Sequence, residues 1–137
     1  MPIVTEDSRI REILAQTRRV IVIGLSSNPD RPSYEVAQAL QSEGFDIVPV
    51  NPNEREVLGV NAFPDLRHVT GLTDVVDVFR SSEHVPQIVD ACIECHVRTL
   101  WLQEGVIHHE AAQKAVDAGI EVVMDRCMLK EYRRLLG

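Results

Sequence analysis

The chain has 137 residues, with 14 Lys or Arg against 21 Asp or Glu and a formal net charge of -7. This length suits one domain spanning residues 1–137. The negative charge excludes general attraction for nucleic acid or anionic lipid, so an anionic ligand needs local cations. No apolar run approaches the roughly 20 residues of a membrane span, and the first residues lack a signal pattern. We therefore expect a cytoplasmic protein, with three reduced cysteines rather than a disulfide framework.

The first half of the chain predicts a helix, a strand, a helix and a strand in that order. Apolar residues at helical spacing behind an acidic first turn predict a helix at residues 5–16. A β-branched run at residues 20–23 is typical of a strand covered on both faces. Ser33 suits the N-cap of the next helix, and residues 45–50 predict the second strand. Residues 51–53, Asn-Pro-Asn, end that strand because proline cannot continue a ladder.

The second half continues this alternation. A short apolar piece at residues 57–60 precedes a buried strand at residues 75–79. The pair Ser81–Ser82 suits the cap of an amphipathic helix with the clearest apolar stripe of the chain. A strand, a helix, a strand and a closing helix follow at residues 97–102, 111–118, 120–124 and 129–136. The alternation predicts an α/β fold, a single domain with a mainly parallel sheet and helices on both faces.

Ligands of such sheets bind beyond the carboxyl ends of the strands, where the strand order reverses. The turn after the first strand supplies hydroxyls at Ser26, Ser27 and Ser33, free helix amides, and one cation, Arg31. This combination suits a phosphate group. The alternative is that Ser33 only caps its helix and Arg31 is solvated.

The same turn does not carry a dinucleotide fingerprint. NAD binding of the usual kind needs a G-x-G-x-x-G turn and an acidic residue after the second strand. Here Gly24 is followed by Leu-Ser-Ser-Asn-Pro, and the second strand ends in Asn51–Pro52. Two prolines, Pro29 and Pro32, predict a longer loop that wraps a ligand differently.

Three segments in order resemble a known family. They are VIGLSSNPDRPSYEVAQALQSEGFDIVPVNP, DVVDVFRSSEHVPQIVD and WLQEGVIHHEAAQKAVDAGIEVVMDRCM, which together cover nearly the whole chain. The chain is similar to the small stand-alone CoA-binding domain proteins, relatives of the N-terminal domain of the succinyl-CoA synthetase α subunit. This resemblance implies a Rossmann-like sheet of five strands with coenzyme A, or a small acyl-CoA, across the strand ends. It assigns ligand contacts to Ser26, Ser27, Asn28, Leu102, Gln103 and Glu104.

The chain also departs from the synthetase. Ser27 and Asp30 stand where that turn has glycines, and Asn53 or Arg55 lies where the synthetase has a lysine. The synthetase continues into a second domain with a phosphorylated histidine, whereas this chain stops at Gly137. We therefore expect no ligase chemistry.

Two arginines at strand ends are the predicted phosphate ligands. CoA carries a pyrophosphate and a 3′-phosphate, and Arg31 and Arg80 both follow predicted strands. Asn51 is expected to hydrogen-bond adenine or ribose. The alternative for Arg80 is a surface ion pair with Glu83. The complete predicted site comprises Gly24, Ser26, Ser27, Asn28, Arg31, Ser33, Asn51, Pro52, Arg80, Leu102, Gln103 and Glu104.

Other reactive residue types predict no catalytic or metal site. The string Cys92-Ile-Glu-Cys-His matches haem attachment, but Cys92 continues the apolar stripe of a helix and is expected in the core, as is Trp101. His108 and His109 are expected to cap a helix or to be solvated rather than to bind metal. Cys127 opens the closing helix, where it is either a buried structural residue or a thiol in reach of CoA.

The leading hypothesis is a protein that binds CoA or a small acyl-CoA and has no identifiable catalytic residues. An alternative is an NAD(P)-dependent or thiol-redox enzyme that uses Cys127. A third is an interaction domain whose CoA site is vestigial. A homo-oligomer or a separate protein partner is compatible with each hypothesis.

Overall fold

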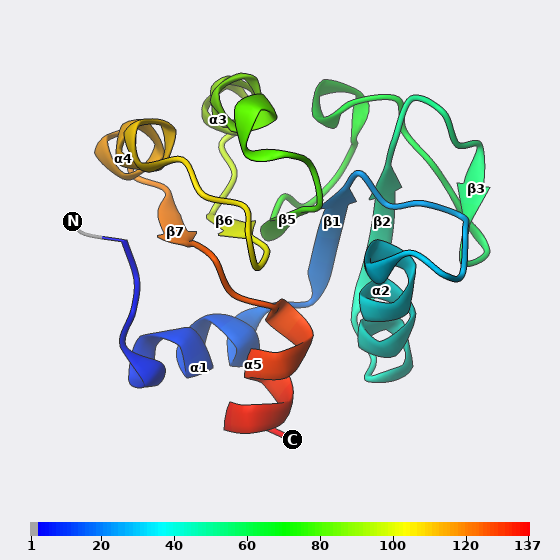
Figure 1. Ribbon diagram of the computed structural model, residues 1–137, viewed down its shortest axis with the longest axis horizontal. Coiled ribbons are helices and arrows are strands. Elements are labelled where there is room, and N and C mark those ends of the chain that lie inside the picture. The colour runs from blue at the N-terminus through cyan, green and yellow to red at the C-terminus, as the bar shows by residue number, and fades with distance from the viewer. Residues whose placement is uncertain (1–2) are drawn as a thin grey trace.

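A computed structural model describes residues 3–137 of the chain (Figure 1). The strands are β1 (Arg19–Ile23), β2 (Asp46–Val50), β3 (Glu56–Val57), β4 (Val60–Asn61), β5 (Val75–Val78), β6 (Thr99–Leu102) and β7 (Glu121–Val123). The helices are α1 (Asp7–Gln16), α2 (Pro32–Ser42), α3 (Val85–Glu94), α4 (His109–Asp117) and α5 (Met128–Leu135). Two 3-10 turns complete the described elements, η1 (Leu66–His68) and η2 (Ser82–His84).

Five strands form the main sheet in the order β2-β1-β5-β6-β7, and every pairing between neighbours is parallel. The chain builds the sheet outward in one direction from β1 to β2, then returns to add β5 on the other side of β1. The strand order therefore reverses between β1 and β5, which is the point where open α/β sheets bind ligands. The predicted Rossmann-like α/β domain with a five-stranded parallel sheet is confirmed.

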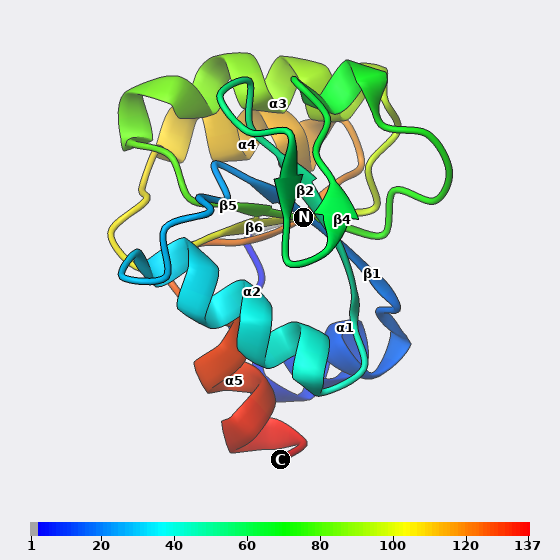
Figure 2. The ribbon, with the colours of Figure 1, turned by 90° about the vertical axis from the view of Figure 1, so that its right-hand side faces the viewer.

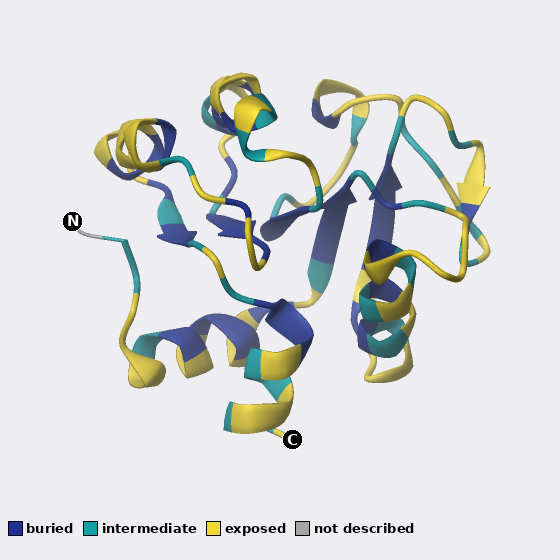
Figure 3. Cartoon of the chain, in the orientation of Figure 1, coloured by how far each residue is buried: buried dark blue, intermediate teal, exposed yellow. Residues whose placement is uncertain are grey.

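Helices cover both faces of the sheet. α3 and α4 lie on one face, and α1, α2 and α5 lie on the other (Figure 1). Each face has its own apolar core cluster, with strand residues alternating between the two. In Figure 3 the helices turn buried residues toward the sheet and exposed residues outward. No helix in residues 3–137 is long and apolar enough to cross a membrane.

The β2 edge of the sheet is covered by the segment that follows it. Pro49 lies within β2, which is compatible with an edge strand because proline cannot donate to a further neighbour. The Phe63 amide donates to the Pro49 carbonyl at 3.0 Å, and the Asn51 amide donates to the Phe63 carbonyl at 2.9 Å. Residues 57–60, expected as one apolar piece, belong instead to the antiparallel β3–β4 hairpin. This segment protects an exposed strand edge.

The predicted serine caps of two helices are wrong. Arg31 is the N-cap residue of α2, and Pro32 holds the first helical position, where its missing N–H costs nothing. The Ser33 hydroxyl instead accepts a hydrogen bond from the Ser26 amide at 3.1 Å. Neither Ser81 nor Ser82 caps α3, because the short turn η2 precedes that helix. The predicted cap at His108 is confirmed, since its Nδ1 accepts from the Ala111 amide at 3.1 Å.

The core contains the apolar residues expected from the sequence. Trp101 is fully buried, and its indole N–H donates to the Arg126 carbonyl at 2.9 Å. Cys92 is also fully buried, and this burial raises the pKa of its thiol to about 12, so the thiol stays neutral. Both predictions of a core position are confirmed.

One carboxyl group interrupts this apolar core. Asp77 lies within β5 and is fully buried, with Val22 of β1 and Trp101 of β6 as its strand neighbours. Both of its carboxylate oxygens accept from the Gln103 side-chain amide, at 3.0 and 3.2 Å. Burial raises the pKa of Asp77 to about 7, and the hydrogen bond from Gln103 opposes this rise. The group therefore titrates near neutral pH.

Two strands approach each other closely where β1 ends. Gly24 has a φ of +87°, and a Cβ atom there would lie 2.6 Å from the Phe79 carbonyl oxygen. The Gly24 amide donates to the Val50 carbonyl at 2.8 Å, and the Phe79 amide donates to the Ile23 carbonyl at 2.8 Å. Any side chain at position 24 would separate the loop after β5 from β1.

Replacement of Gly24 by alanine is expected to destabilise the fold by about 3 kcal/mol, because left-handed strain and the backbone clash add together. The measurement is chemical denaturation. Gly59→Ala is the matched control, since Gly59 also has a positive φ of +78° but no atom within 4 Å of a built Cβ. That variant is expected to lose about 1 kcal/mol through strain alone. Equal losses in the two variants would contradict the role of the Gly24 contact.

The Asp77→Asn variant is expected to gain stability over the wild type as pH rises. The pKa of Asp77 is raised in the folded chain, so well below pH 4 the carboxyl is protonated in both folded and unfolded states and makes no pH-dependent contribution to stability. Between pH 4 and pH 8 the wild type loses roughly 4 kcal/mol that the neutral amide does not lose.

Denaturation midpoints at pH 5, 6, 7 and 8 measure this difference. Asp117→Asn is the control, because Asp117 forms an exposed pair with Gln113 on α4. A stability difference between the Asp77 variant and the wild type that is constant over this pH range would show that Asp77 is already ionised at low pH.

Candidate functional site

The loops after β1, β5, β6 and β7 meet at one edge of the sheet (Figure 2). Hydrogen bonds join these loops to one another. The Ser82 hydroxyl accepts from the Ile107 amide at 2.9 Å, and the Asp125 carboxylate accepts from the Gly105 amide at 2.7 Å. The loops after the last three strands are thus tied together before any ligand arrives, which reduces the ordering cost of binding.

The loop after β1 is held by its own polar side chains. The Ser26 hydroxyl accepts from the Asn28 amide at 3.1 Å, and the Asn28 side chain accepts from the Asp30 amide at 3.0 Å. These local turns explain why Ser, Asn and Asp occupy the loop without further glycines. The Ser26 and Ser33 hydroxyls, expected as phosphate donors, both act as acceptors of loop amides. Each hydroxyl still has its proton to donate.

The Ser27 amide faces a carboxylate. It donates to the Glu54 side chain at 2.6 Å, across from the loop after β2. A carboxylate at this place shows that the loop offers an amide to an anion. Glu54 was not predicted as part of the site, because the sequence gives no sign that it reaches the first loop.

A pocket of about 700 Å³ opens between the start of α2 and the loop after β6. We call it the arginine pocket. It is lined by Gly24, Ser26, Arg31, Pro32, Ser33, Glu35, Val36, Phe79, Arg80, Gln103, Glu104, Val106, Cys127 and Lys130. Its volume lies within the usual range for small-molecule sites.

The two predicted arginines are exposed and available to a ligand. Among residues 3–137, neither the Arg31 nor the Arg80 side chain forms a hydrogen bond or an ion pair. The alternative pairing of Arg80 with Glu83 does not form, since the nearest recorded cation of Glu83 is His84 at 3.7 Å. Unpaired guanidinium groups beside a pocket suit phosphate oxygens.

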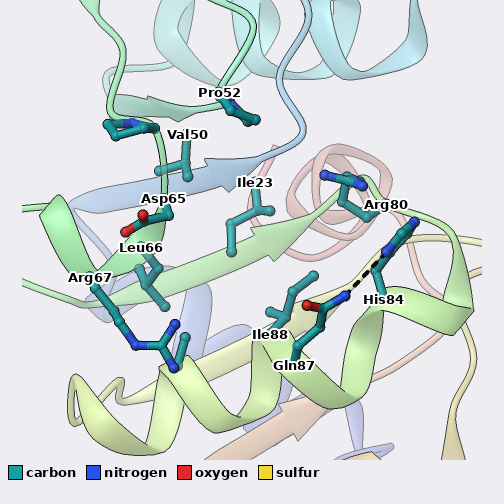
Figure 4. A pocket seen from close by; sticks show the side chains of 12 residues that line it. Ile23, Val50, Pro52, Asp65, Leu66, Arg67, Arg80, His84, Gln87 and Ile88 are labelled. Atoms are coloured by element: carbon teal, nitrogen blue, oxygen red, sulfur yellow. Dashed lines mark hydrogen bonds between the residues drawn. The ribbon is translucent and has the colours of Figure 1, made fainter.

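A second pocket of about 330 Å³ lies on the other side of Arg80 (Figure 4). We call it the apolar pocket. Figure 4 shows the side chains of Ile23, Val50, Leu66 and Ile88 around its floor. Its rim contains Pro52 and the polar residues Asp65, Arg67, Arg80, His84 and Gln87. Arg80 lines both pockets, so a single ligand that fills both must pass this arginine.

The structure brings seven of the twelve predicted site residues together in the arginine pocket. These are Gly24, Ser26, Arg31, Ser33, Arg80, Gln103 and Glu104. Pro52 lines the apolar pocket instead. Ser27, Asn28, Asn51 and Leu102 line neither pocket.

Two of those four residues have structural contacts that explain their position. Leu102 is fully buried, and its carbonyl accepts a hydrogen bond from the Arg126 amide at 3.2 Å. The Asn51 side chain donates to the Leu25 carbonyl at 3.1 Å and accepts from the Asn53 amide at 3.0 Å. Asn51 thus holds the loops after β1 and β2 together, and a contact with adenine or ribose stays a prediction.

Sequence reasoning did not find Lys130 as a site residue. It lies on α5 and forms an ion pair with Glu104 at 2.8 Å within the arginine pocket. An exposed lysine within a helix carries no pattern that separates it from other solvated residues. Lys130 reaches the pocket only because α5 packs beside the carboxyl ends of the strands.

The three cysteines are free, and Cys127 is buried with its side chain at the wall of the arginine pocket. The part of the chain that the structure describes contains no cluster of three or more His, Cys, Asp or Glu residues that could hold a metal ion.

Comparison with known proteins supports a CoA-related family. Residues 18–133 match the sequence model of a family described as CoA binding domain. Protein YneT of Bacillus subtilis is 40% identical over 121 residues, which cover 88% of this chain and 90% of YneT. The α subunit of ADP-forming acetate–CoA ligase II from Pyrococcus furiosus is 33% identical over 82 residues, covering 59% of this chain and 18% of that subunit.

A solved structure has the same fold over the full chain. The protein from Pyrococcus horikoshii superimposes with a TM-score of 0.94 and 33% identity, and covers 100% of this chain and 98% of its own. Because the family match covers most of the chain and the fold agrees throughout, this protein belongs to the CoA-binding domain family.

Proposed function

We propose that the protein binds coenzyme A or a small acyl-CoA across the carboxyl edge of its sheet. The observation that carries this proposal is the pair of unpaired arginines beside the strand-order reversal, with a pocket on each side of Arg80. The family and the partial match to a CoA ligase subunit support it. In this arrangement the phosphates lie near Arg80 and Arg31.

The charge distribution favours a ligand with several phosphates. CoA carries a pyrophosphate and a 3′-phosphate, whereas the chain has a formal net charge of -7. Attraction must therefore come from the few cations at the site. Arg31 and Arg80 have fork-shaped guanidinium groups that match phosphate oxygens, and Lys130 adds a third positive charge.

The two pockets suit the two ends of CoA. The apolar pocket has aliphatic walls that fit the flat faces of an adenine ring. The arginine pocket is larger and has mixed walls, from Val106 to Gln103, that fit the pantetheine arm with its amide groups. Arg80 between them lies where the phosphates of such a ligand would pass.

The alternative of an NAD(P)-dependent or thiol-redox enzyme is not favoured. The dinucleotide fingerprint is missing, and the family is one of CoA binding. The third hypothesis, an interaction domain with a vestigial site, predicts the same fold without affinity for CoA. Titration of the reduced protein with CoA, acetyl-CoA and NAD separates these possibilities.

Removal of either arginine is expected to weaken CoA binding about tenfold to a hundredfold, because each loses hydrogen bonds to a charged group. The variants are Arg31→Gln and Arg80→Gln, since glutamine keeps the first two methylene groups of arginine and removes the charge. This choice matters most at Arg80, whose aliphatic stem lies near Gly24. Arg11→Gln is the control, because Arg11 is exposed on α1 and lines neither pocket. Calorimetric titration measures the dissociation constants. Unchanged affinity in both site variants would show that CoA does not bind here.

The Glu54→Gln variant is expected to bind CoA about two- to fivefold more tightly. The neutral amide still accepts from the Ser27 N–H, but it no longer repels a phosphate near the first loop. Glu56→Gln, an exposed change two residues further along, is the control. The same titration at two salt concentrations measures the effect, which should shrink as salt rises. Weaker binding by Glu54→Gln would indicate that the carboxylate helps to order the loop for the ligand.

A further inference from the structure

The Asp77–Gln103 pair connects the interior of the sheet with the arginine pocket. Asp77 is fully buried, whereas Gln103, at 6% exposure, lines that pocket. The Gln103 side chain contacts both carboxylate oxygens through the same nitrogen, Nε2. No other residue in the described part of the chain donates a hydrogen bond to the Asp77 side chain. The state of Asp77 therefore determines how the Gln103 amide is turned.

An ionised Asp77 fixes one orientation of this amide. A carboxylate can only accept hydrogen bonds, so the NH₂ group of Gln103 must face it. The Gln103 carbonyl oxygen then turns away from Asp77 and accepts no recorded hydrogen bond from residues 3–137. It is also absent from the fully buried side-chain atoms without a partner, where only Thr99 Oγ1 occurs among the described residues. The carbonyl oxygen thus meets the space of the pocket.

A protonated Asp77 allows a different pairing. The carboxylic acid can donate its O–H to the Gln103 carbonyl while its other oxygen accepts from the Gln103 N–H. Both ends of the amide are then engaged with Asp77, and the acceptor that faced the pocket is lost. The two protonation states present different hydrogen-bonding groups to a ligand.

We propose that ionised Asp77 positions Gln103 so that its carbonyl oxygen accepts a hydrogen bond from the pantetheine arm of CoA, and that protonation of Asp77 withdraws this acceptor. The donor on the ligand is an amide N–H or the thiol S–H of that arm. This inference rests on the proposed function, and it makes Asp77 a positioning residue that does not touch the ligand.

No charged side chain contributes to the pKa of Asp77, so the change between pH 6 and pH 8 is expected to come from Asp77 itself. Its strand neighbours Val22 and Trp101 carry no charge. Burial and the Gln103 hydrogen bond account for a pKa of about 7, without a contribution from any charged side chain. On the pocket side, the titratable and charged groups are Arg31, Glu35, Arg80, Glu104, Cys127 and Lys130. None of these groups forms a recorded hydrogen bond or ion pair with the Asp77 side chain, whose recorded partner is Gln103.

The test compares CoA with the methyl ester of adenosine 3′-phosphate 5′-diphosphate, which has the nucleotide, the esterified pyrophosphate and the 3′-phosphate of CoA but no pantetheine arm. Calorimetric titrations at pH 6 and pH 8 give the affinity of each compound for the reduced wild-type protein. The ratio of the two affinities cancels the titration of the shared 3′-phosphate. This ratio is expected to rise about tenfold from pH 6 to pH 8, as the ionised fraction of Asp77 grows.

Two variants separate positioning from folding. Asp77→Asn has an NH₂ group that imitates the protonated acid, so its ratio should stay at the low value of the wild type at pH 6 and should not change with pH. Gln103→Met keeps the length of the side chain but lacks the carbonyl acceptor, and its ratio should also be low at both pH values. Asp117→Asn, which changes the exposed Asp–Gln pair on α4, should behave as the wild type.

Acetyl-CoA identifies the donor, because it has the amides of CoA but no S–H group. A pH dependence equal to that of CoA assigns the donor to an amide N–H, and loss of the dependence assigns it to the thiol. Either result supports the inference.

Two other outcomes overturn it. If CoA and the methyl ester both bind but their affinity ratio is the same at pH 6 and pH 8, or Asp77→Asn keeps the pH dependence of the wild type, the positioning role is wrong while the proposed function stands. If neither compound binds at either pH, the proposed function fails and the inference fails with it.

Discussion

The contact between the backbones at Gly24 and Phe79 determines the shape of the binding edge. β1 ends against β5 at the point where the strand order reverses, and the approach is possible only without a side chain at position 24. Arg80 directly follows Phe79 and lines both pockets. A displaced Phe79 would therefore move the one arginine that the two pockets share. The position of Arg80 thus depends on position 24, directly after β1, having no Cβ atom.

Asp77, in contrast to Gly24, lowers the stability of the fold when its carboxyl group is ionised. A buried strand of a parallel sheet is normally apolar, and a carboxylate among Val22 and Trp101 has a large desolvation cost. Gln103 offsets part of this cost with one hydrogen-bonding group, which leaves the pKa of Asp77 near neutral. An amide at the same place would keep the hydrogen bond without the charge. Asp77 is a carboxyl group in a strand that is otherwise apolar, and it contacts Gln103, which lines the arginine pocket. A role in function explains such a residue better than a role in stability.

The sequence predicted the fold well because buried parallel strands are recorded as β-branched runs. Residues 20–23 and 120–124 are examples: the first range lies within β1, and the second contains β7. The wrong predictions concern helix starts and a short hairpin, where the same residues are compatible with more than one local structure. Pro32 starts α2 and leaves Ser33 free to bind the Ser26 amide, so a serine before a helix was not a cap. The β3–β4 hairpin has strands of two residues, too short for any alternation to be visible.

The site was predicted in part for the same reason. Arg31 ends the loop between β1 and α2, and Arg80 lies in the loop after β5, so the topology brings both arginines to the carboxyl edge of the sheet. Lys130 depends on the packing of α5, and Glu54 depends on how the loop after β2 folds back, which no spacing in the sequence encodes. Asp77 did leave a signal, as a lone carboxyl in the run Val-Val-Asp-Val-Phe. Such a residue is a reason to look for a polar partner at the end of a neighbouring strand, and Gln103 is that partner.

The carboxylates of the site affect selectivity as well as affinity. Glu54 binds the Ser27 amide, and Glu104 pairs with Lys130, so a ligand phosphate competes with a carboxylate for each of these donors. The net binding free energy from each donor is therefore the difference between its interaction with the phosphate and its interaction with the carboxylate that the phosphate replaces. A phosphate has more charge and more acceptor oxygens than a carboxylate. Its advantage over the carboxylate is therefore largest where an unpaired arginine lies next to the donor. A ligand with several phosphates gains this difference at each position, whereas a monoanion gains little. An acidic protein can thereby discriminate in favour of a highly charged nucleotide.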